Sequence, residues 1–223
     1  MAALDNVYTI VVNWNLPNDT VACVRSLFAA GAQPGQVIVV DNGSTDDSLA
    51  RIEEAFGPRV WLLRSATNLG FAGGNNLAMA AALARGAQWI MLVNNDTVVA
   101  PDFFDALECC AVAHPHLALI APLILYSGEP HRIWSLGDRR VAGTLLTRSV
   151  LRDAVVPADL PPMIEVDSLN ACGLLIRRDV LEAVGLFDTG YFMYGEDVDF
   201  FHRAQERGFR LGCCTGAHMW HKV

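Results

Sequence analysis

Three carboxylates stand close together in the stretch MYGEDVD, towards the end of the sequence. Glu196, Asp197 and Asp199 lie within four residues, at the start of a predicted helix. The helix dipole favours one or two carboxylates at such a position, but three exceed what capping requires. Neighbouring carboxylates raise one another's pKa, so we expect one of them to be poised as a general base.

A second chemical motif is Asn94-Asn95-Asp96, which follows a predicted buried strand. Hard divalent cations prefer carboxylate ligands and use few protein groups when substrate phosphates complete their coordination. One aspartate at a strand end therefore suits a metal–diphosphate site, and an ordinary turn explains the motif equally well. His218 and His221 are further candidate ligands, although a lone histidine is more often structural.

Polar side chains also follow the first two predicted strands. Asn13 and Asn15 come after the first, and Asp41, Asn42 and Ser44 come after the second. Such groups can hydrogen-bond a nucleobase or a ribose. Turn formation accounts for several of the same residues, so each motif alone is weak.

A glycine-rich segment, NLGFAGGNN, contains Asn68, Gly70, Gly73 and Asn76. Glycine lets the backbone approach a ligand closely, and the amides at a helix start can bind phosphate. The glycine spacing is not that of a dinucleotide fingerprint. It is not a P-loop either, because no Gly-Lys-Ser/Thr follows.

These motifs need a scaffold, and the hydrophobic pattern predicts one. Apolar, β-branched runs indicate strands, and amphipathic stretches between them indicate helices. The predicted strands are residues 7–12, 37–40, 60–63, 89–93 and 166–177, and the predicted helices are 18–30, 44 or 45 to 56, 75–85, 101–114, 179–184 and 197–207. This alternation predicts an α/β fold with a mostly parallel sheet and helices on both faces, with ligands beyond the carboxyl ends of the strands.

The segment between residues 126 and 165 has weak periodicity and predicts short strands and a mobile loop. The longest apolar run, residues 117–126, is about half of a membrane span and contains Pro122. At 223 residues the chain suits a single domain. We expect residues 1 to about 100 to form a nucleotide-binding half, and residues from about 101 to 223 to form an acceptor-binding and catalytic half that includes a small C-terminal acceptor-side portion.

Composition narrows the functional classes. The net charge of −8 disfavours binding to nucleic acid. The six cysteines show neither a disulfide framework nor a zinc-site spacing, which is typical of reduced thiols in a cytosolic protein. The start of the sequence shows no signal-peptide pattern.

The order of the motifs is more specific than any one of them. The stretches IVVNWN, VIVVDNGSTDDS, NLGFAGGNN, WIMLVNNDT, CGLLIRRDVLEAVGLFD, YFMYGEDVDFFHRA and WHK resemble the inverting glycosyltransferases of family 2, which have the GT-A fold. The rhamnosyltransferase-like members are the most similar. The resemblance runs over nearly the whole chain, and it says little about the donor sugar or the acceptor.

The resemblance implies roles for particular residues. Asn13, Asn15, Asp41, Asn42 and Ser44 would hold the nucleoside. Asn68, Gly70, Gly73 and Asn76 would surround the nucleotide and its phosphates, together with Asn94 and Asn95. The family's Asp-x-Asp metal motif has asparagine in its first position here, so metal retention would depend on Asp96 together with His221. Asp197 would be the general base.

The remaining implied roles concern the acceptor and the setting. Trp134 and Cys172 match a region that faces the sugar and acceptor, where ordinary packing explains them equally well. Tyr194 and Glu196 flank the base, and Tyr194 could stack on an acceptor ring. The family implies Mg²⁺ or Mn²⁺, a nucleoside-diphosphate-sugar donor, and a saccharide or lipid-linked saccharide acceptor for surface polysaccharide synthesis. Such an acceptor would place the enzyme in the cytoplasm, at the inner face of a membrane.

Two other functions share much of this chemistry. A sugar nucleotidyltransferase would carry a glycine-rich loop with Arg and Lys after the first strand, and residues 13–17 (NWNLP) lack one. A nucleotide-binding protein with weakened catalysis is favoured slightly by the changed metal motif. Retention of both Asp96 and Asp197 argues against it.

Overall fold

The first half of the chain forms the predicted parallel sheet. The computed structural model describes residues 4–142 and 147–222. The parallel strands are β1 (Val7–Asn13), β2 (Val37–Asn42), β3 (Trp61–Ser65) and β4 (Trp89–Asn94). The apolar sequences of β1, β2 and β4 are typical of strands with both faces covered, and every residue of β2 is buried, whereas β3 at the end of the sheet is only partly buried.

The second half extends this sheet. Within the described residues the sheet has ten strands. Eight of them follow the order β10-β12-β6-β11-β4-β1-β2-β3, while β5 pairs with β12 and β7 pairs with β6. The added strands are β5 (Thr97–Val99), β6 (Leu117–Tyr126), β7 (Ile133–Ser135), β10 (Met163–Val166), β11 (Gly173–Arg177) and β12 (Arg210–His221). Strand β11 is antiparallel to both β4 and β6, whereas β12 is parallel to β6. The α/β fold is confirmed, and its second half is mixed.

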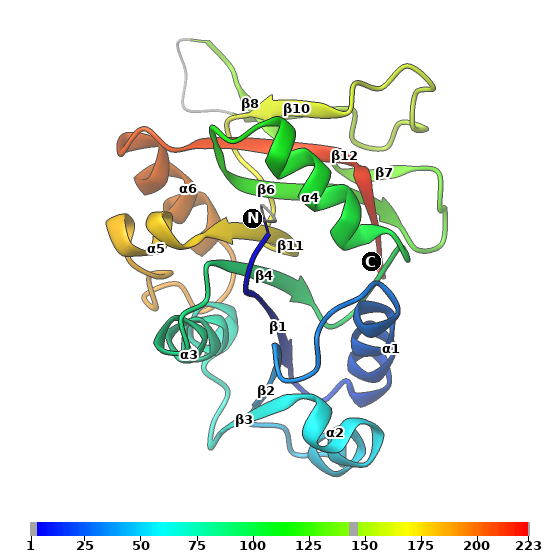
Figure 1. Cartoon of the computed structure of the whole chain (residues 1–223), viewed down its shortest axis with the longest axis vertical. Helices are drawn as coiled ribbons and strands as arrows, with labels where there is room; N and C mark the ends of the chain where they lie inside the picture. The colour runs from blue at the N-terminus through cyan, green and yellow to red at the C-terminus, as the bar shows by residue number, and fades with distance from the viewer. Residues whose placement is uncertain (1–3, 143–146, 223) are drawn as a thin grey trace.

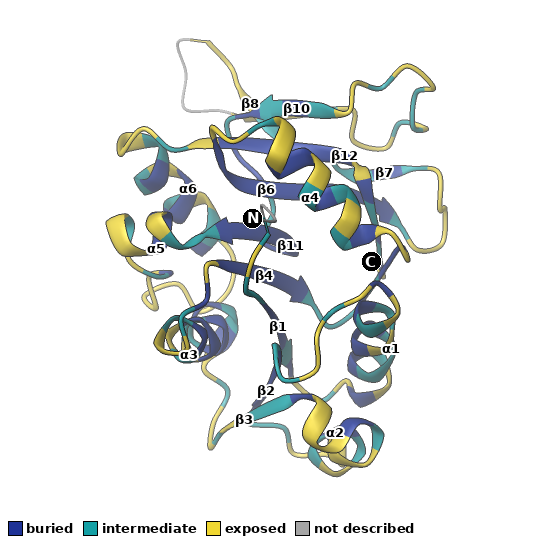
Figure 2. Ribbon diagram, viewed as in Figure 1, coloured by how far each residue is buried: buried dark blue, intermediate teal, exposed yellow. Residues whose placement is uncertain are grey.

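Helices cover both faces of the sheet (Figure 1). One core contains residues of α3, α5 and α6, and the other contains residues of α1, α2 and α4. The helices are α1 (Pro17–Ala29), α2 (Ser48–Phe56), α3 (Gly70–Ala84), α4 (Phe103–Ala113), α5 (Arg178–Val184) and α6 (Glu196–Glu206), with a short 3₁₀ turn at Gly57–Arg59. Figure 2 shows the buried strands between these helix layers. None of the helices in the described ranges has both the length and the apolar character needed to cross a bilayer.

Three predicted boundaries were wrong. Helix α3 begins at Gly70 rather than at residue 75, so the glycine-rich segment forms its first turns. Helix α2 begins at Ser48 rather than at residue 44 or 45, because the Ser44 side chain bonds to the end of β1 instead. The strand predicted over 166–177 is two strands, β10 and β11, with residues 167–172 between them.

Two long strands were not predicted. Strand β6 is buried on both faces, and its Pro122 pairs opposite Cys214, where β12 shifts register before His218. Proline cannot donate to a sheet ladder, so it is tolerated at such a bulge.

Strands β8 (Asp138–Arg140) and β9 (Thr147–Ser149) form a separate hairpin, and residues 143–146 of the predicted loop lie outside the described residues.

Candidate active site

Two cavities meet at the carboxyl ends of the parallel strands. The larger has a volume of about 1150 Å³ and the smaller about 180 Å³. Both are lined by Asp96 and Asn94 from the end of β4, and by Phe71, Ala171 and Met193. The larger cavity also contains Asp197 and His221. The fold therefore brings the predicted base and the predicted metal ligands to one cavity.

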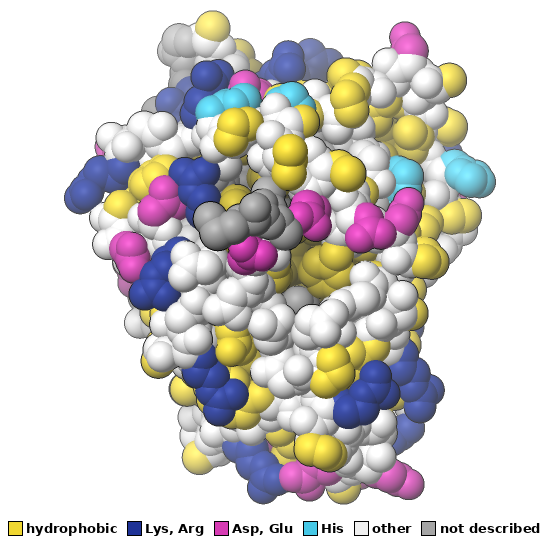
Figure 3. Space-filling view, in the orientation of Figure 1, with side chains coloured by type: hydrophobic (Ala, Val, Ile, Leu, Met, Phe, Trp, Pro, Cys, Tyr) yellow, Lys and Arg dark blue, Asp and Glu magenta, His cyan; other side chains and the backbone are white. Residues whose placement is uncertain are grey.

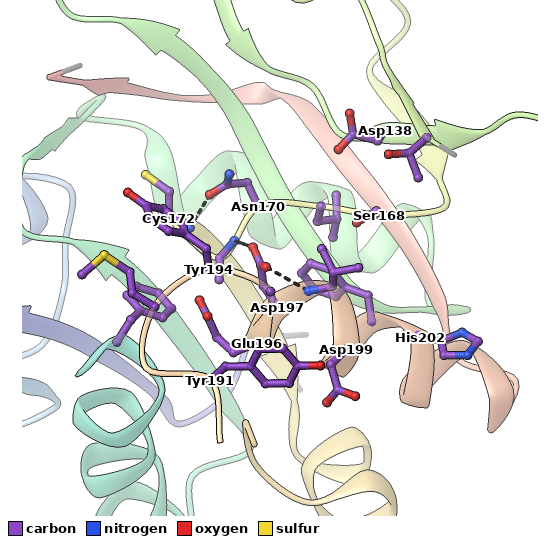
Figure 4. Close-up of a pocket in the computed structure, with 18 of the residues that line it drawn as sticks. Asp138, Ser168, Asn170, Cys172, Tyr191, Tyr194, Glu196, Asp197, Asp199 and His202 are labelled. Atoms are coloured by element: carbon purple, nitrogen blue, oxygen red, sulfur yellow. Dashed lines mark hydrogen bonds between the residues drawn. The ribbon is translucent and has the colours of Figure 1, made fainter. Parts of the chain in front are cut away.

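Asp197 lies in the first turn of α6, inside the larger cavity (Figure 4). Its Oδ1 accepts a hydrogen bond from the N–H of Val198 at 2.9 Å, and its Oδ2 accepts a longer one from Ala171 at 3.4 Å. Burial raises the pKa of this carboxyl above its ordinary value, the two N–H donors partly offset that rise, and the Asp138 charge adds to it. A carboxylate with a raised pKa holds a proton more tightly, as a general base requires.

The other two carboxylates of the cluster differ in their surroundings. Glu196 is only 4% exposed, and its Oε2 has no hydrogen-bond partner. Burial is the main reason that its pKa is raised, and the Asp197 charge raises it further. Asp199 instead forms an ion pair with Arg203, whose Nε lies 2.7 Å from its Oδ2. The Asp199 carboxylate is therefore paired within α6, one turn along the helix, and is not a free acceptor in the cavity.

Asp96 and His221 lie together, as predicted. His221 Nε2 is 3.3 Å from Asp96 Oδ1, because the end of β12 pairs with β5 directly after the Asp96 turn. Two buried atoms of this pair, Asp96 Oδ1 and His221 Nδ1, have no hydrogen-bond partner. The Trp134 ring packs edge-on against His221, with centroids 4.5 Å apart.

Asp96 and His221 could supply two ligands to a divalent cation, and the remaining ligands would have to come from outside the protein. Among the described residues no group of three or more His, Cys, Asp or Glu side chains could hold a metal ion. Mg²⁺ is commonly held by one or two carboxylates together with substrate phosphates and water. One carboxylate and one imidazole would therefore hold a cation only when a phosphate ligand is present.

A buried polar network joins the ends of β1, β2 and β4. Asn13 Nδ2 donates to Asp41 Oδ1 at 3.2 Å and to Ser44 Oγ at 3.0 Å. Thr20 Oγ1 donates to Asn13 Oδ1 at 2.6 Å and accepts from Asn95 Nδ2 at 3.1 Å. The sequence analysis missed Thr20. The only sequence signal for it is its position in the first turn of α1, close to the polar residues after β1. Asn13 is fully buried and Asp41 is 6% exposed, so this network shapes the rim from below.

Asn15 belongs to the same corner. It has a positive φ of 54°, its N–H donates to Ser44 Oγ at 3.1 Å, and its Oδ1 accepts from the N–H of Thr45 at 2.8 Å. Two bonds between the loops after β1 and β2 hold both turns in a fixed relation. The exposed side chains of Trp14 and Leu16 beside it line the smaller cavity.

Asn42 organises the start of α3. Its Nδ2 donates to Asn68 Oδ1 at 3.0 Å and to the Gly70 carbonyl at 3.1 Å, and its Oδ1 accepts from the N–H of Leu69. Asn68 Oδ1 also accepts from the N–H of Gly70 at 2.8 Å. Asn42, Asn68 and Gly70 line the smaller cavity, so the structure brings these three predicted residues together.

Two other predicted residues of this segment lie elsewhere. The Asn76 side chain exchanges two hydrogen bonds with the backbone of Phe187, at 2.8 and 3.1 Å. Gly73 packs against Leu69, whose Cβ would lie 2.7 Å from an added methyl group. Neither residue lines the two cavities, because both sit on other faces of α3. Asn76 is a link between α3 and the segment after α5.

Gly70 faces the loop that precedes α6. Its φ is +73°, and an added Cβ would lie 2.2 Å from the carbonyl oxygen of Phe192. The N–H of Phe71 donates to the same oxygen at 2.9 Å. In that loop Tyr194 has a positive φ of 69° and is 84% exposed. The glycine is therefore needed for contact with the protein itself, and not only for contact with a ligand.

The wall of the larger cavity away from Asp96 contains residues that the sequence analysis missed. Trp134 and Cys172 line this cavity as predicted, and burial raises the pKa of the Cys172 thiol well above its ordinary value. Asn170, which the family resemblance also puts in the region facing the acceptor, lines the same cavity, and the additional polar lining residues are Asp138, Arg140, Asp167, His202 and Gln205. Asp138 and Arg140 come from the stretch without clear periodicity, which gave no signal for them, whereas His202 and Gln205 lie in α6.

Comparisons with known proteins agree with this arrangement. A family model described as glycosyltransferase like family 2 matches residues 5–222. Galactofuranosyltransferase GlfT1 of Mycobacterium tuberculosis is 30% identical over 219 residues, covering 97% of this chain and 70% of the relative. N-acetylglucosaminyl-diphospho-decaprenol L-rhamnosyltransferase of the same species is 32% identical over 222 residues, covering 89% of this chain and 70% of the relative.

A solved structure supports the fold. The crystal structure of GalNAc-T7 with UDP, GalNAc and Mn²⁺ matches with a TM-score of 0.72 and 15% identity. The match covers 98% of this chain and 44% of that one, so the chain spans less than half the length of this structural neighbour. At this identity the likeness concerns the arrangement of the sheet and helices.

Proposed function

Since the chain belongs to glycosyltransferase-like family 2, we propose that it transfers a sugar from a nucleoside diphosphate to an acceptor hydroxyl, with inversion at the anomeric carbon. The observation that carries the proposal is one cavity lined by both Asp197 and the Asp96–His221 pair. A base and a diphosphate-binding site have to face the same space for a single displacement. A raised pKa at Asp197 supports its role as the base.

The donor would occupy the side of the site built by the first half of the chain. The nucleoside would lie on the rim formed after β1 and β2, supported from below by Asn13 and Asp41. The start of α3, with Asn68 and Gly70, would approach the phosphates. The second half, from about residue 101, would bind the acceptor in the larger cavity. The structural neighbour solved with UDP and Mn²⁺ supports a nucleotide and a cation of these classes.

The chemistry would follow from the positions of a few groups. Asp197 would accept the proton of the acceptor hydroxyl while that oxygen attacks the anomeric carbon, and the bond to the diphosphate oxygen would break on the opposite side. General-base assistance of this kind is typically worth about 10²- to 10⁴-fold in rate. Asp96 and His221 would hold Mg²⁺ or Mn²⁺, which supplies positive charge to the leaving diphosphate.

The acceptor would be a saccharide or a lipid-linked saccharide of a surface polysaccharide. The names of the two mycobacterial relatives support this class, because one transfers galactofuranose and the other acts on a diphospho-decaprenol acceptor. Rhamnose is one candidate sugar on the same basis. A nucleotide-sugar donor would be used in the cytoplasm, and a lipid-linked acceptor would bring the reaction to the membrane face.

The decisive experiment compares two substitutions on the same helix. Asp197→Asn removes the base, and Asp199→Asn removes a neighbouring carboxylate that is paired with Arg203. We expect Asp197→Asn to lower transfer by at least about 10²-fold while nucleotide affinity stays within a few-fold, and Asp199→Asn to retain most activity. Wild-type turnover in Asp197→Asn would remove the base assignment.

The donor is found by a thermal-shift panel of nucleoside diphosphates and their sugars, with and without Mn²⁺. A ligand that binds only the folded state raises the melting temperature by mass action. We expect one base to give a shift that depends on the cation. Equal shifts with and without Mn²⁺ for every nucleotide would contradict the proposed cation site.

A further inference from the structure

Buried polar atoms without a hydrogen-bond partner gather in the larger cavity. In the described part of the chain there are six such side-chain atoms. Four of them belong to residues that line this cavity, namely Asp96, Trp134, Glu196 and His221. A third cavity, of about 390 Å³, is lined by Asp5, Asp105 and Glu108 and contains none of the six, although Figure 3 shows acidic side chains around a hollow on that face. Because buried polar groups are nearly always paired, the larger cavity is the place where this fold needs partners from outside the protein.

The His221 imidazole lacks the hydrogen bond that usually fixes a metal-binding histidine. Such a histidine binds the ion through one ring nitrogen and donates its other N–H to a carboxylate, a carbonyl or water. His221 presents Nε2 to Asp96 Oδ1 at 3.3 Å, and its Nδ1 is buried without any partner among the described residues. Another contact must therefore hold this ring in its orientation.

The side chain that packs on the imidazole is Trp134. The two rings meet edge-on, with an angle of 66° between their planes and 4.5 Å between their centroids, which is a favourable arrangement for an aromatic pair. The indole Nε1 is itself buried without a hydrogen-bond partner. Packing, rather than a hydrogen bond from either ring, therefore relates Trp134 to His221.

The segment after the β8–β9 hairpin holds Trp134 in place. The N–H of Ile133 donates to the Ala154 carbonyl at 2.9 Å, and the N–H of Asp153 donates to the Ile133 carbonyl at 2.8 Å. Arg152, from the same segment, has its Cζ 5.5 Å from the centroid of the indole, and a guanidinium is attracted to the face of such a ring. Backbone pairing and this guanidinium thus fix the indole before any ligand binds.

We propose that Trp134 is a positioning residue for the cation site, which holds the His221 imidazole so that Nε2 and the Asp96 carboxylate face the same point. This inference rests on the proposed function, because the cation is part of it. Ordering a free side chain during binding costs affinity, and a site with two protein ligands has no third ligand to compensate. The role differs from the acceptor contact that the family resemblance implies for Trp134.

A magnetic-resonance spectrum of the full chain without ligand tests the packing. In a ¹H–¹⁵N correlation spectrum of the histidine side chains, His221 is identified by the signal that His221→Asn removes. Ring currents of the indole should displace this signal from the position of a free imidazole. Trp134→Leu should return it towards the free position, whereas Trp61→Leu should not move it.

Calorimetry tests the consequence for the cation, with Mn²⁺ titrated into the chain in the presence of UDP, GDP or dTDP. We expect Trp134→Leu to lower the affinity for Mn²⁺ by about 10- to 100-fold, as the loss of an outer partner of a metal-binding histidine does. Trp134→Phe keeps an aromatic edge and should restore most of the affinity. If Trp134→Leu does not fold, Trp134→Met fills more of the space and carries the same expectation.

The matched control is Trp61→Leu, which removes the same atoms from β3 at the end of the sheet. The Trp61 ring also carries a guanidinium, with Arg85 Cζ 3.6 Å from its centroid. The control therefore loses a comparable contact far along the sheet from β12, and it should bind Mn²⁺ as the wild type does.

Three results would overturn the proposal. An equal fall of Mn²⁺ affinity in Trp134→Leu and Trp61→Leu would show a general loosening of the fold. Unchanged Mn²⁺ affinity in Trp134→Leu, with a raised KM for the acceptor, would assign Trp134 to acceptor binding instead. If the wild type binds Mn²⁺ with none of the three nucleotides, the cation site fails and this role fails with it, while the base assignment is still judged separately by Asp197→Asn.

Discussion

The N–H of Phe71 donates to the carbonyl oxygen of Phe192 across 2.9 Å, which ties the first turn of α3 to the loop before α6. The two segments belong to different halves of the chain. One leads to the predicted phosphate-binding turn, and the other leads to Asp197. The backbone therefore makes the contact between the proposed donor side and the proposed acceptor side, and Gly70 is the residue that permits it.

Gly70→Ala tests this contact. The added methyl group would meet the Phe192 carbonyl at 2.2 Å on a backbone with φ of +73°. We expect the free energy of unfolding to fall by about 3 kcal/mol, from the left-handed conformation and the overlap together. Urea denaturation measures it. Gly208→Ala is the control, because Gly208 has φ of +85° with nothing within 4 Å of an added Cβ, and it should cost only about 1 kcal/mol.

The cation site is tested by Asp96→Asn and His221→Asn. Each removes one of the two protein groups that lie 3.3 Å apart. We expect the affinity for Mn²⁺, measured by calorimetry in the presence of the nucleoside diphosphate, to fall by at least about tenfold. His218→Asn, three residues before His221 on the same strand, should leave it unchanged. Undiminished Mn²⁺ affinity in both site variants would place the cation elsewhere.

The acid limb of the pH–rate profile tests the surroundings of Asp197. A base acts only when ionised, so a raised pKa moves the acid limb of kcat/KM to higher pH than an ordinary aspartate gives. The Asp138 charge contributes to that rise. Asp138→Asn should therefore lower the pKa of Asp197 and shift the acid limb to lower pH. Asp167→Asn, another lining carboxylate, is the control, and an equal shift there would point to a general charge effect.

The buried carboxyl of Glu196 makes the stability of the protein depend on pH. Its pKa is raised in the folded state, chiefly by burial, so the folded chain binds its proton more tightly than the unfolded chain does. The stability of the wild type therefore falls as the pH rises from the ordinary glutamate pKa of about 4.3 through the raised folded value. Glu196→Gln should melt at a higher temperature than the wild type above that window, and the advantage should vanish below it.

The control for Glu196 is Glu54→Gln, which removes the same charge from an exposed position on α2. Melting curves across the acidic to neutral range should show no growing difference between this variant and the wild type. If Glu196→Gln melts at the same temperature as the wild type at every pH, burial of Glu196 carries no electrostatic cost.

The first half of the fold could be predicted from sequence because its signals are local. Each of the first four strands is a short apolar run followed by polar residues, and each helix predicted in this half lies between two of them. Asp41 and Asp96 were placed at strand ends for that reason. Because the carboxyl ends of parallel strands lie at the same edge of a sheet, the fold class alone predicted that Asp41 and Asp96 lie on the same side of the molecule.

The second half depended on contacts that the sequence does not display. The continuous apolar run of β6 fits a buried strand or a buried helix equally well. In β12 the glycines and the bulge after Cys214 interrupt any alternation. The start of α3 was placed too late because glycine disfavours helices, whereas Gly74 fits against Val12 and Asn42, where a side chain would collide.

The same limit applies to the site residues. Asn76 looked like part of a phosphate loop, and only the packed structure shows its two bonds to the backbone of Phe187. The cavity residue Asp138 comes from a hairpin whose position is set by a bridge to Ser168. No spacing rule predicts a pairing of that kind.

Strand β12 also connects the proposed cation site to a distant part of the sequence. It inserts between β10 and β6, and only its final residues bring His221 beside Asp96. Pairings between distant segments form slowly because their loop entropy is lost before the contacts are gained. The Asp96–His221 pair therefore depends on the pairing of β12 with β5 and β6, so a change that weakens this part of the sheet would also loosen the proposed cation site.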